Sequence, residues 1–403
     1  MKALVLAAAK SKKLLPFSET RPKMMIHLCG AYILERLLIQ LKEAGVTEVF
    51  LVVSHQQQMI RDFFGRGREL GLKIEYLVQE TPGSIGEAVL LGAQPLAQED
   101  RFLLVYADAM VTGNCFKALL DQAAQSNKAN LATVTHPASE GAYGNVYLSG
   151  EMTISKLIEK PGKGRLSNYI FGGSFIFTKD CFDLLKKNGG DMLGLFQTLI
   201  GKSDLEAYLW EKGWIDISRP WHILIANQLI MKDWDRSIIP DSVVLEKGVN
   251  INGPVVFGER VRVCSGVNIN GPCYIGADSF IGHSSLIRDF SSIGPGSTIG
   301  YGSEVKNAVL FGNSVVGRLS FIGDSVLGAG VHLGSGTMTI NNSVSGGSVV
   351  FESPEGETLD TELVKLGAFI GDAAVIGTGH NLAPGTWISA GAVIKDHFTY
   401  PLK

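Results

Sequence analysis

The chain has 403 residues and a formal net charge of −3, from 36 basic and 39 acidic side chains. Its 45% hydrophobic and 19% charged residues exclude extended disorder and predict two or three domains, each with its own core. The near balance of charge provides no general attraction to nucleic acid or to an anionic membrane, and no apolar run reaches the roughly 18 residues of a membrane span. The 48 glycines lack the every-third spacing of collagen, so they indicate a turn-rich β architecture.

The cysteines and the start of the chain indicate the compartment. The five cysteines form no CxxC pair, so neither a zinc ribbon nor a disulfide framework is expected, and a reducing compartment fits. We interpret the short apolar stretch Met1–Ala9 as a buried first strand rather than as a signal peptide. A cytoplasmic protein is therefore expected.

Up to about residue 235, apolar β runs alternate with helical patterns. The runs Ala3–Ala8, Val49–Val53 and Phe102–Tyr106 are typical of buried parallel strands. A helical face stopped by Gly45 lies between the first two runs and consists of Ile33, Leu34, Leu37, Leu38 and Leu41. This alternation predicts a doubly wound α/β domain over residues 1–235, with ligands bound beyond the carboxyl ends of the strands.

From residue 245 an apolar residue recurs every six positions, which is the signature of a parallel β-helix built from three hexads per coil. The unbroken register is Leu245, Ile251, Phe257, Val263, Ile269, Ile275, Ile281, Ile287, Ile293, Ile299, Val305 and Phe311. It continues, with two steps shortened to five, through Val316, Ile322, Leu327 and Leu333, and returns at Ile370, Ile376, Leu382, Ile388 and Ile394. We therefore expect a linker at 236–244, a β-helix over 245–403, and an outward loop at Asn341–Leu363, where the repeat is broken.

The segments Leu6–Pro16 and Glu19–Lys23 resemble the opening of sugar-1-phosphate nucleotidylyltransferases. With the hexapeptide-repeat tail, nearly the whole chain resembles the two-domain nucleotidylyltransferase/acetyltransferases of archaeal and bacterial type. The resemblance implies a Rossmann-like nucleotidyltransferase domain followed by a left-handed parallel β-helix. It also implies attack of a sugar phosphate on the α-phosphorus of a nucleoside triphosphate, with the charge neutralised by cations and backbone N–H groups.

The phosphate loop of that family reads Gly-x-Gly-Thr-Arg. Here Ala9 and Ser11 replace the two glycines, Lys12 replaces threonine and Lys13 replaces arginine. Lysine keeps the positive charge but loses the bidentate grip of arginine on phosphate. The resemblance implies that the nucleotide is bound at Ala8, Ala9 and Lys12 and that the catalytic cations are Lys13 and Lys23.

Further family motifs follow in the same order along the chain. The segment that reads the nucleobase matches at Gln79, Gly83 and Ser84, and the two carboxylates that hold Mg²⁺ match at Asp108 and Asp216. Two carboxylates together with substrate phosphates suit this hard cation.

The sugar-phosphate side of the family matches at Gly144, Glu159, Lys160 and Gly173, with Lys160 on the phosphate. In the tail, the family's acetyltransferases use a histidine as general base, and Arg318 occupies that position here. Arginine stays protonated and cannot accept a proton. Phe321 stands where tyrosine is usual, and Asn341 is retained, so the acetyltransferase site is degenerate.

Three functions remain open at this point. The preferred one is Mg²⁺-dependent nucleotidyl transfer to a sugar-1-phosphate at reduced efficiency, with UTP and dTTP both open because Gln79 and Gly83 occur with uracil and with thymine readers. The alternatives are a non-catalytic homologue that binds nucleotide sugar and regulates a partner subunit, and a hexapeptide acyltransferase. A homo-oligomer, most simply a trimer, is expected because the flat faces of a prism can pack about a three-fold axis.

Overall fold

The structure is a computed structural model that describes residues 1–8, 11–54, 57–81, 83–137, 143–159, 167–344, 346–353 and 355–397. The chain forms two compact units, each made of two stretches: Met1–Lys10 with Ile33–Asp216, and Ser11–Tyr32 with Ile217–Lys403. This division differs from the expected linker at 236–244. One reason is that the early segment packs with the β-helix, where the ring of Phe17 lies 5.2 Å from that of Phe311.

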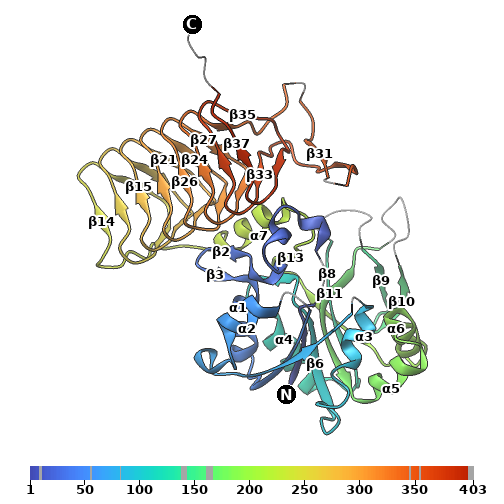
Figure 1. The fold of residues 1–403 in the computed structure, drawn as a ribbon. Coiled ribbons are helices and arrows are strands. Elements are labelled where there is room, and N and C mark those ends of the chain that lie inside the picture. The colour runs from blue at the N-terminus through green and yellow to red at the C-terminus, as the bar shows by residue number, and fades with distance from the viewer. Residues whose placement is uncertain are drawn as a thin grey trace, which may run out of the picture. The chain divides into compact units, whose positions relative to one another are not determined.

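The first unit is built on a seven-stranded mixed sheet in the order β12-β8-β11-β6-β1-β4-β5 (Figure 1). The predicted parallel strands are confirmed, because β1 pairs in parallel with both β4 and β6, whereas β11 runs antiparallel to β6 and β8. The strands are β1 (Ala3–Leu6), β4 (Glu48–Val53), β5 (Lys73–Val78), β6 (Arg101–Tyr106), β8 (Leu131–Thr135), β11 (Ile170–Thr178) and β12 (Glu206–Trp210).

Each α-helix of this unit buries apolar residues, whereas the short helix η4 (Arg68–Leu70) buries none. In α1 (Ile33–Glu43), the five residues of the predicted apolar face are all buried. The other helices are α2 (Gln57–Phe64), η4 (Arg68–Leu70), α3 (Ile85–Leu90), α4 (Cys115–Gln125), α5 (Asp180–Lys187) and α6 (Met192–Gly201). Two short antiparallel pairs complete the unit: β7 (Ala109–Val111) with β13 (Trp214–Asp216), and β9 (Asn145–Leu148) with β10 (Ile154–Ile158). Among the described residues, no helix combines the length and the apolar composition that crossing a membrane requires.

The second unit contains the predicted left-handed parallel β-helix, whose three faces are parallel sheets (Figure 1). The first sheet is β14 (Val244–Leu245), β17 (Arg262–Val263), β20 (Phe280–Ile281), β23 (Thr298–Ile299), β26 (Val315–Val316), β29 (His332–Leu333), β34 (Val375–Ile376) and β37 (Val393–Ile394). The second is β15 (Asn250–Asn252), β18 (Asn268–Asn270), β21 (Leu286–Ile287), β24 (Glu304–Lys306), β27 (Phe321–Gly323), β30 (Met338–Thr339) and β35 (Asn381–Leu382). The third is β16 (Val255–Phe257), β19 (Cys273–Ile275), β22 (Ser291–Ile293), β25 (Val309–Leu310), β28 (Val326–Leu327), β33 (Phe369–Ile370) and β36 (Trp387–Ile388).

The predicted inward register is confirmed from Ile251 onward except at Phe311, where it is wrong by one residue, and Leu245 in the first coil is exposed. Leu310 pairs with Ile293 below and Leu327 above and belongs to the prism core. The first five-residue step therefore falls between Val305 and Leu310. Phe311 instead lies against Phe17 and under the guanidinium of Arg21, 5.0 Å from its ring centroid.

Besides the β-helix, this unit contains a β-hairpin and a group of short helices and strands. The break after Asn341 forms an antiparallel hairpin of β31 (Val350–Glu352) and β32 (Thr358–Asp360), and the ring of Phe351 lies 5.3 Å from that of Trp221. The remaining elements are η1 (Lys12–Leu14), η2 (Phe17–Glu19), η3 (Lys23–Met25), β2 (His27–Leu28), β3 (Ala31–Tyr32) and α7 (His222–Met231).

Candidate active site

The pairing of β7 with β13 brings two predicted metal ligands together. Asp108 lies between β6 and β7, directly before Ala109, and Asp216 ends β13. The register pairs Asp216 with Ala109, so the two aspartates are neighbours across the ladder. Both lie half-buried at the carboxyl edge of the sheet, where parallel α/β sheets bind their ligands.

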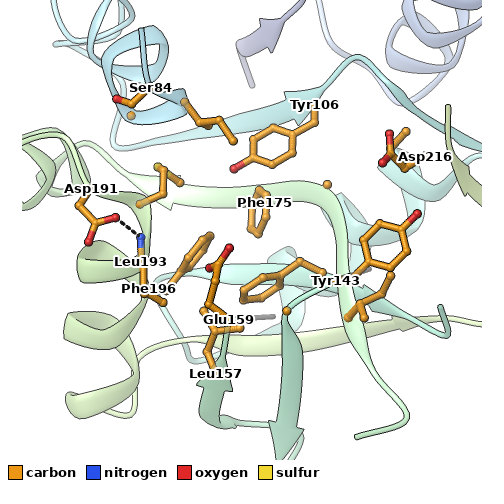
Figure 2. A pocket seen from close by; sticks show the side chains of 18 of the residues that line it. Ser84, Tyr106, Tyr143, Leu157, Glu159, Phe175, Asp191, Leu193, Phe196 and Asp216 are labelled. Carbon is orange, nitrogen blue, oxygen red and sulfur yellow. Dashed lines mark hydrogen bonds between the residues drawn. The ribbon is translucent and has the colours of Figure 1, made fainter. Parts of the chain in front are cut away.

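A cavity of about 720 Å³ opens beside these carboxylates and lies entirely in the first unit. Figure 2 shows Asp216 and Tyr143 on one side of it, Ser84 and Asp191 on the other, and Glu159 between them. The residues predicted from the sequence that line it are Ser84, Asp108, Gly144, Glu159, Gly173 and Asp216. The structure therefore gathers the predicted metal and sugar-phosphate residues into one site, except for Lys160, which lies outside the described residues.

Two tyrosines that line the cavity have raised pKa values. Burial, together with the negative charges of Asp108 and Glu159, raises the pKa of Tyr106. Burial and the charges of Asp216 and Asp108 raise the pKa of Tyr143 in the same way. Both hydroxyls therefore stay protonated at neutral pH and can serve as hydrogen-bond donors or acceptors to a ligand.

Two glycines allow close packing in the wall of the cavity. Gly173 has φ +83 and lies where the register of β11 shifts, and a side chain there would begin 3.2 Å from the Cβ of Ala109. A Cβ on Gly86 would lie 1.9 Å from the carbonyl oxygen of Gly190, so only glycine lets α3 approach the turn before α6. Asp191 caps α6 by accepting hydrogen bonds from the N–H groups of Leu193 and Gly194, both at 3.0 Å.

Sequence reasoning missed most of the apolar wall. It comes from β11 and α6 and comprises Ile170, Phe171, Phe175, Met192, Leu193 and Phe196. The turn Gly189-Gly190-Asp191 could have marked the start of a helix, since Asp is a favoured N-cap. Nothing local in the sequence signals that this helix borders the site.

The predicted base-reading residues lie next to one another. A Cβ on Gly83 would be 2.9 Å from Gln79 Nε2 and would overlap the carboxylate of Glu87. Ser84 caps α3 in a capping box, with its Oγ 3.2 Å from the N–H of Glu87. Ala8 follows β1 and is half-buried, and Ala9 lies outside the described residues.

The predicted catalytic lysines, Lys13 and Lys23, belong to the second unit, as does Lys12, which is predicted to bind the nucleotide. Lys12 and Lys13 are exposed in η1, and Lys12 Nζ lies 3.8 Å from Glu355 Oε1. Lys23 is buried in η3. Ser11 has φ −109, outside the left-handed region that favours glycine.

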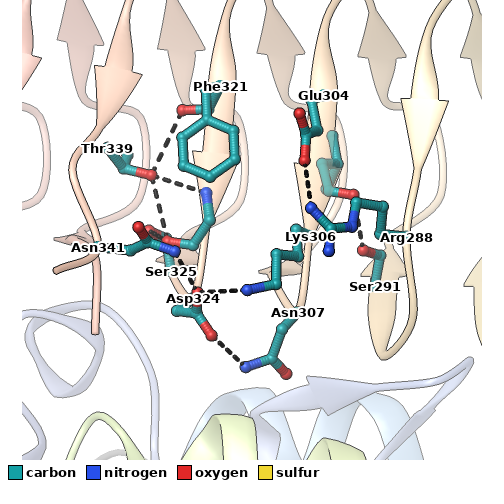
Figure 3. A network of polar contacts seen from close by, with 12 residues as sticks. Arg288, Ser291, Glu304, Lys306, Asn307, Phe321, Asp324, Ser325, Thr339 and Asn341 are labelled. Carbon is teal, nitrogen blue, oxygen red and sulfur yellow. Dashed lines mark hydrogen bonds and ion pairs between the residues drawn. The ribbon is translucent and has the colours of Figure 1, made fainter. Parts of the chain in front are cut away.

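The residues predicted to form a degenerate acetyltransferase site lie on the β-helix, and Figure 3 shows two of them, Phe321 and Asn341. Asn341 donates to Asp324 Oδ2 at 2.6 Å, Asn307 donates to Asp324 Oδ1 at 2.7 Å, and Lys306 Nζ lies 3.6 Å away. The two amides satisfy the oxygens of the buried Asp324 carboxylate, and Lys306 balances its charge. Arg318 lies exposed before β27.

Phe321 packs its ring against Gly323, where a side chain would begin 2.5 Å from the ring. Its ring carries no hydroxyl group that could replace the one usual at this position. Neither Arg318 nor Phe321 can therefore supply the proton acceptor that acetyl transfer needs.

Comparison with known proteins agrees with this geometry. Residues 2–232 match the nucleotidyl transferase family. The chain belongs to that family. Residues 269–354 also match the GMPPB C-terminal domain. The expected sugar-1-phosphate nucleotidyltransferase family is thereby confirmed.

Relatives share both units. The Bifunctional protein GlmU of Methanococcus maripaludis is 33% identical over 98% of this chain and 93% of its own length. A Bifunctional sugar-1-phosphate nucleotidylyltransferase/acetyltransferase of Sulfurisphaera tokodaii is 28% identical over 98% of this chain and 96% of its own. A solved Bacillus anthracis structure, assigned as a glucose-1-phosphate thymidylyltransferase and bound to sucrose, covers 57% of this chain and 94% of that one with a TM-score of 0.53 and 17% identity. This last likeness shows the fold alone.

Proposed function

We propose that the protein transfers a nucleotidyl group from UTP or dTTP to a sugar-1-phosphate, releasing pyrophosphate, and that it needs Mg²⁺ to do so. The observation that supports this most is the pairing of Asp216 with Ala109, which sets a second carboxylate beside Asp108 at the mouth of a cavity of sugar-phosphate size.

The two aspartates fit magnesium because their donors are hard oxygens, with Asp216 paired to Ala109, the residue that follows Asp108. When bound, the cation would neutralise the charge that develops on the α-phosphate and on the leaving pyrophosphate. The role of Asp108 and Asp216 is to hold it, and the half-burial of both strengthens that interaction.

The cavity supports a role in binding the sugar. Glu159 presents an acceptor for sugar hydroxyls, and Tyr106 and Tyr143 present neutral hydroxyls. Aromatic faces of Phe175 and Phe196 provide the apolar contact that a sugar ring prefers on its C–H faces. By resemblance, Lys160 contacts the sugar phosphate, while Lys12, Lys13 and Lys23 contact the triphosphate. Because Lys13 replaces an arginine, we propose that transfer is slow.

The deciding experiment measures pyrophosphate release by the full chain with Mg²⁺ over a panel of triphosphates and sugar-1-phosphates. Release with UTP or dTTP and one sugar phosphate, lost without a divalent cation, is expected. If no pair releases pyrophosphate but a nucleotide sugar still binds, the protein is the regulatory homologue instead.

We also propose that the protein is a cytoplasmic trimer. Its five cysteines are free and buried, which fits a reducing compartment, and the flat faces of the prism offer surfaces for three-fold packing. Sedimentation at micromolar concentration should report about 130 kDa, three times the 43.3 kDa chain. A single species near the mass of one chain contradicts the trimer.

A further inference from the structure

Three potential metal ligands meet at one corner of the β-helix and are not among the residues of the proposed reaction. They are Glu246, Cys264 and His283. One ligand atom from each lies within 4.8 Å of those of the other two. The three side chains are a carboxylate, a thiol and an imidazole, each of which is a group that binds Zn²⁺ in proteins.

The coils of the β-helix position these side chains. Glu246 follows β14, Cys264 follows β17 and His283 comes two residues after β20, so each ligand comes from a different strand of one sheet. The N–H of Glu246 donates to Val263 and the N–H of Cys264 donates to Ile281, both at 2.9 Å. The backbone is thus ordered by the coil stack itself, and a cation would not have to organise the site.

Neighbouring residues orient the ligands. The N–H of Ser265 donates to Glu246 Oε2 at 3.0 Å, and its Oγ lies 3.0 Å from His283 Nδ1. Arg262 donates to Glu246 Oε1 at 2.8 Å. Oε1 also accepts from Arg262 Nε at 3.2 Å, whereas Oε2 accepts from Ser265 and keeps a second lone pair for a cation. Hydrogen bonds of this kind around a metal ligand fix its direction and are typical of metal sites.

We propose that Glu246, Cys264 and His283 bind one Zn²⁺ ion, with water as the fourth ligand. A sulfur and an imidazole nitrogen select Zn²⁺ over Mg²⁺ and Ca²⁺, which take oxygen ligands. Binding converts the Cys264 thiol to a thiolate and releases its proton to solvent. The thiolate supplies one negative charge to the ion, and the Glu246 carboxylate is shared between the ion and Arg262. His283 is exposed, which gives a cation access to the buried sulfur.

The ion would join the first three coils. Leu245, in the first coil, is 39% exposed although its register position is inward, because no coil covers that end of the core in the described part of the chain. A cross-link between successive coils at this end would resist fraying of the prism. The site is independent of nucleotidyl transfer, which needs only oxygen ligands for its cation.

The test uses the full chain, freed of metal with a chelator and titrated with Co²⁺ in place of Zn²⁺. A thiolate bound to Co²⁺ absorbs in the near ultraviolet, whereas the carboxylates Asp108 and Asp216 cannot produce that band. We expect one equivalent of Co²⁺ to develop the band and Zn²⁺ to abolish it. Cys264→Ser should remove the band, and His283→Gln should weaken binding about tenfold or more.

His332→Gln is the matched control, since His332 is an exposed histidine of the same sheet and lies outside the cluster. It should bind Co²⁺ as the unaltered chain does. If Cys264→Ser fails to fold, the exposed His283 variant decides. Absence of the band in the unaltered chain, or an equal affinity in His283→Gln and His332→Gln, would overturn the proposal.

Discussion

Asp216 pairs with Ala109 in the antiparallel ladder between β7 and β13, which places its carboxylate next to Asp108. Each of these strands has three residues, so the position of the aspartate pair depends on a very short register. A slip of one residue would turn Asp216 to the opposite face of the ladder. The buried side chain of Trp214 helps to hold that register by donating from Nε1 to the carbonyl of Gly172 at 2.9 Å.

Replacing either aspartate by asparagine should abolish nucleotidyl transfer. Asparagine keeps the shape but loses the charge that holds a divalent cation, and the loss of such electrostatic stabilisation typically costs about 10²-fold or more in rate. Pyrophosphate release should therefore fall by at least that factor in Asp108→Asn and Asp216→Asn. Asp100→Asn is the control, because its side chain is 99% exposed and outside the cavity. Full activity in Asp108→Asn would refute the assignment.

Restoring the family's phosphate loop should raise the rate. One lost charge-assisted contact costs about 2–4 kcal/mol, or roughly 10²–10³ in rate. The combined change Ala9→Gly, Ser11→Gly and Lys13→Arg should recover a similar factor in kcat. Because the φ of Ser11, −109, lies outside the left-handed region that favours glycine, most of the gain should appear in Lys13→Arg alone. A single Ser11→Gly change that matches the triple variant would contradict this reasoning.

Acetyl transfer should be absent. Arg318 remains protonated at every physiological pH and cannot act as a base. Thiol release from acetyl-coenzyme A should stay at the uncatalysed level with any amino-sugar phosphate, and Arg318→Ala should behave in the same way. Turnover above background by the unaltered chain would show that another residue supplies the base.

The ion pair of Arg21 with Asp372 should contribute strongly to the stability of the second unit. Their side chains are 10% and 14% exposed, and Asp372 also accepts from Thr20 Oγ1 at 2.7 Å and from the N–H of Ala329 at 2.8 Å. Asp372→Asn leaves the guanidinium charge buried without a counter-ion, which should lower the free energy of unfolding by about 3 kcal/mol. Urea denaturation followed by circular dichroism measures this loss. The exposed Asp241→Asn change should have little effect, and equal stability of the two variants would argue against the ion pair's role.

Acid should weaken the edge of the central sheet through Glu48. Hydrogen bonds from Lys73 and Lys2 hold the pKa of this carboxyl below its ordinary value of 4.5. Because the pKa of Glu48 is lower in the folded state, its ionised carboxyl stabilises the folded protein at pH values above 4.5. This contribution disappears as the pH falls through the lowered pKa. The unaltered chain should therefore exceed Glu48→Gln in denaturation midpoint at pH 7 and lose that advantage in acid. If the advantage in denaturation midpoint over Glu48→Gln persists or grows in acid, the predicted pH dependence is wrong.

Regular elements could be predicted because their signals are local. The five apolar residues of α1 lie within nine positions, and the hexads repeat every six, so each pattern states which side of an element is buried. The error at Phe311 shows the limit of such patterns. Leu310 and Phe311 are both apolar, so the pattern does not show which of them points into the prism. This depends on which coil is one residue shorter, and on the contacts of Phe311 with the distant residues Phe17 and Arg21.

The sequence by itself determined the two architectures, the order of the motifs and the identity of the two metal-binding aspartates proposed here. Only the tertiary structure decided which side chains converge. The ladder that joins Asp108 to Asp216, the glycine contact that brings α6 to the cavity, and the corner shared by Glu246, Cys264 and His283 have no local signature. The physical reason is that periodicity records which face of an element meets the core, whereas convergence depends on strand register and on close approach between segments distant in the chain.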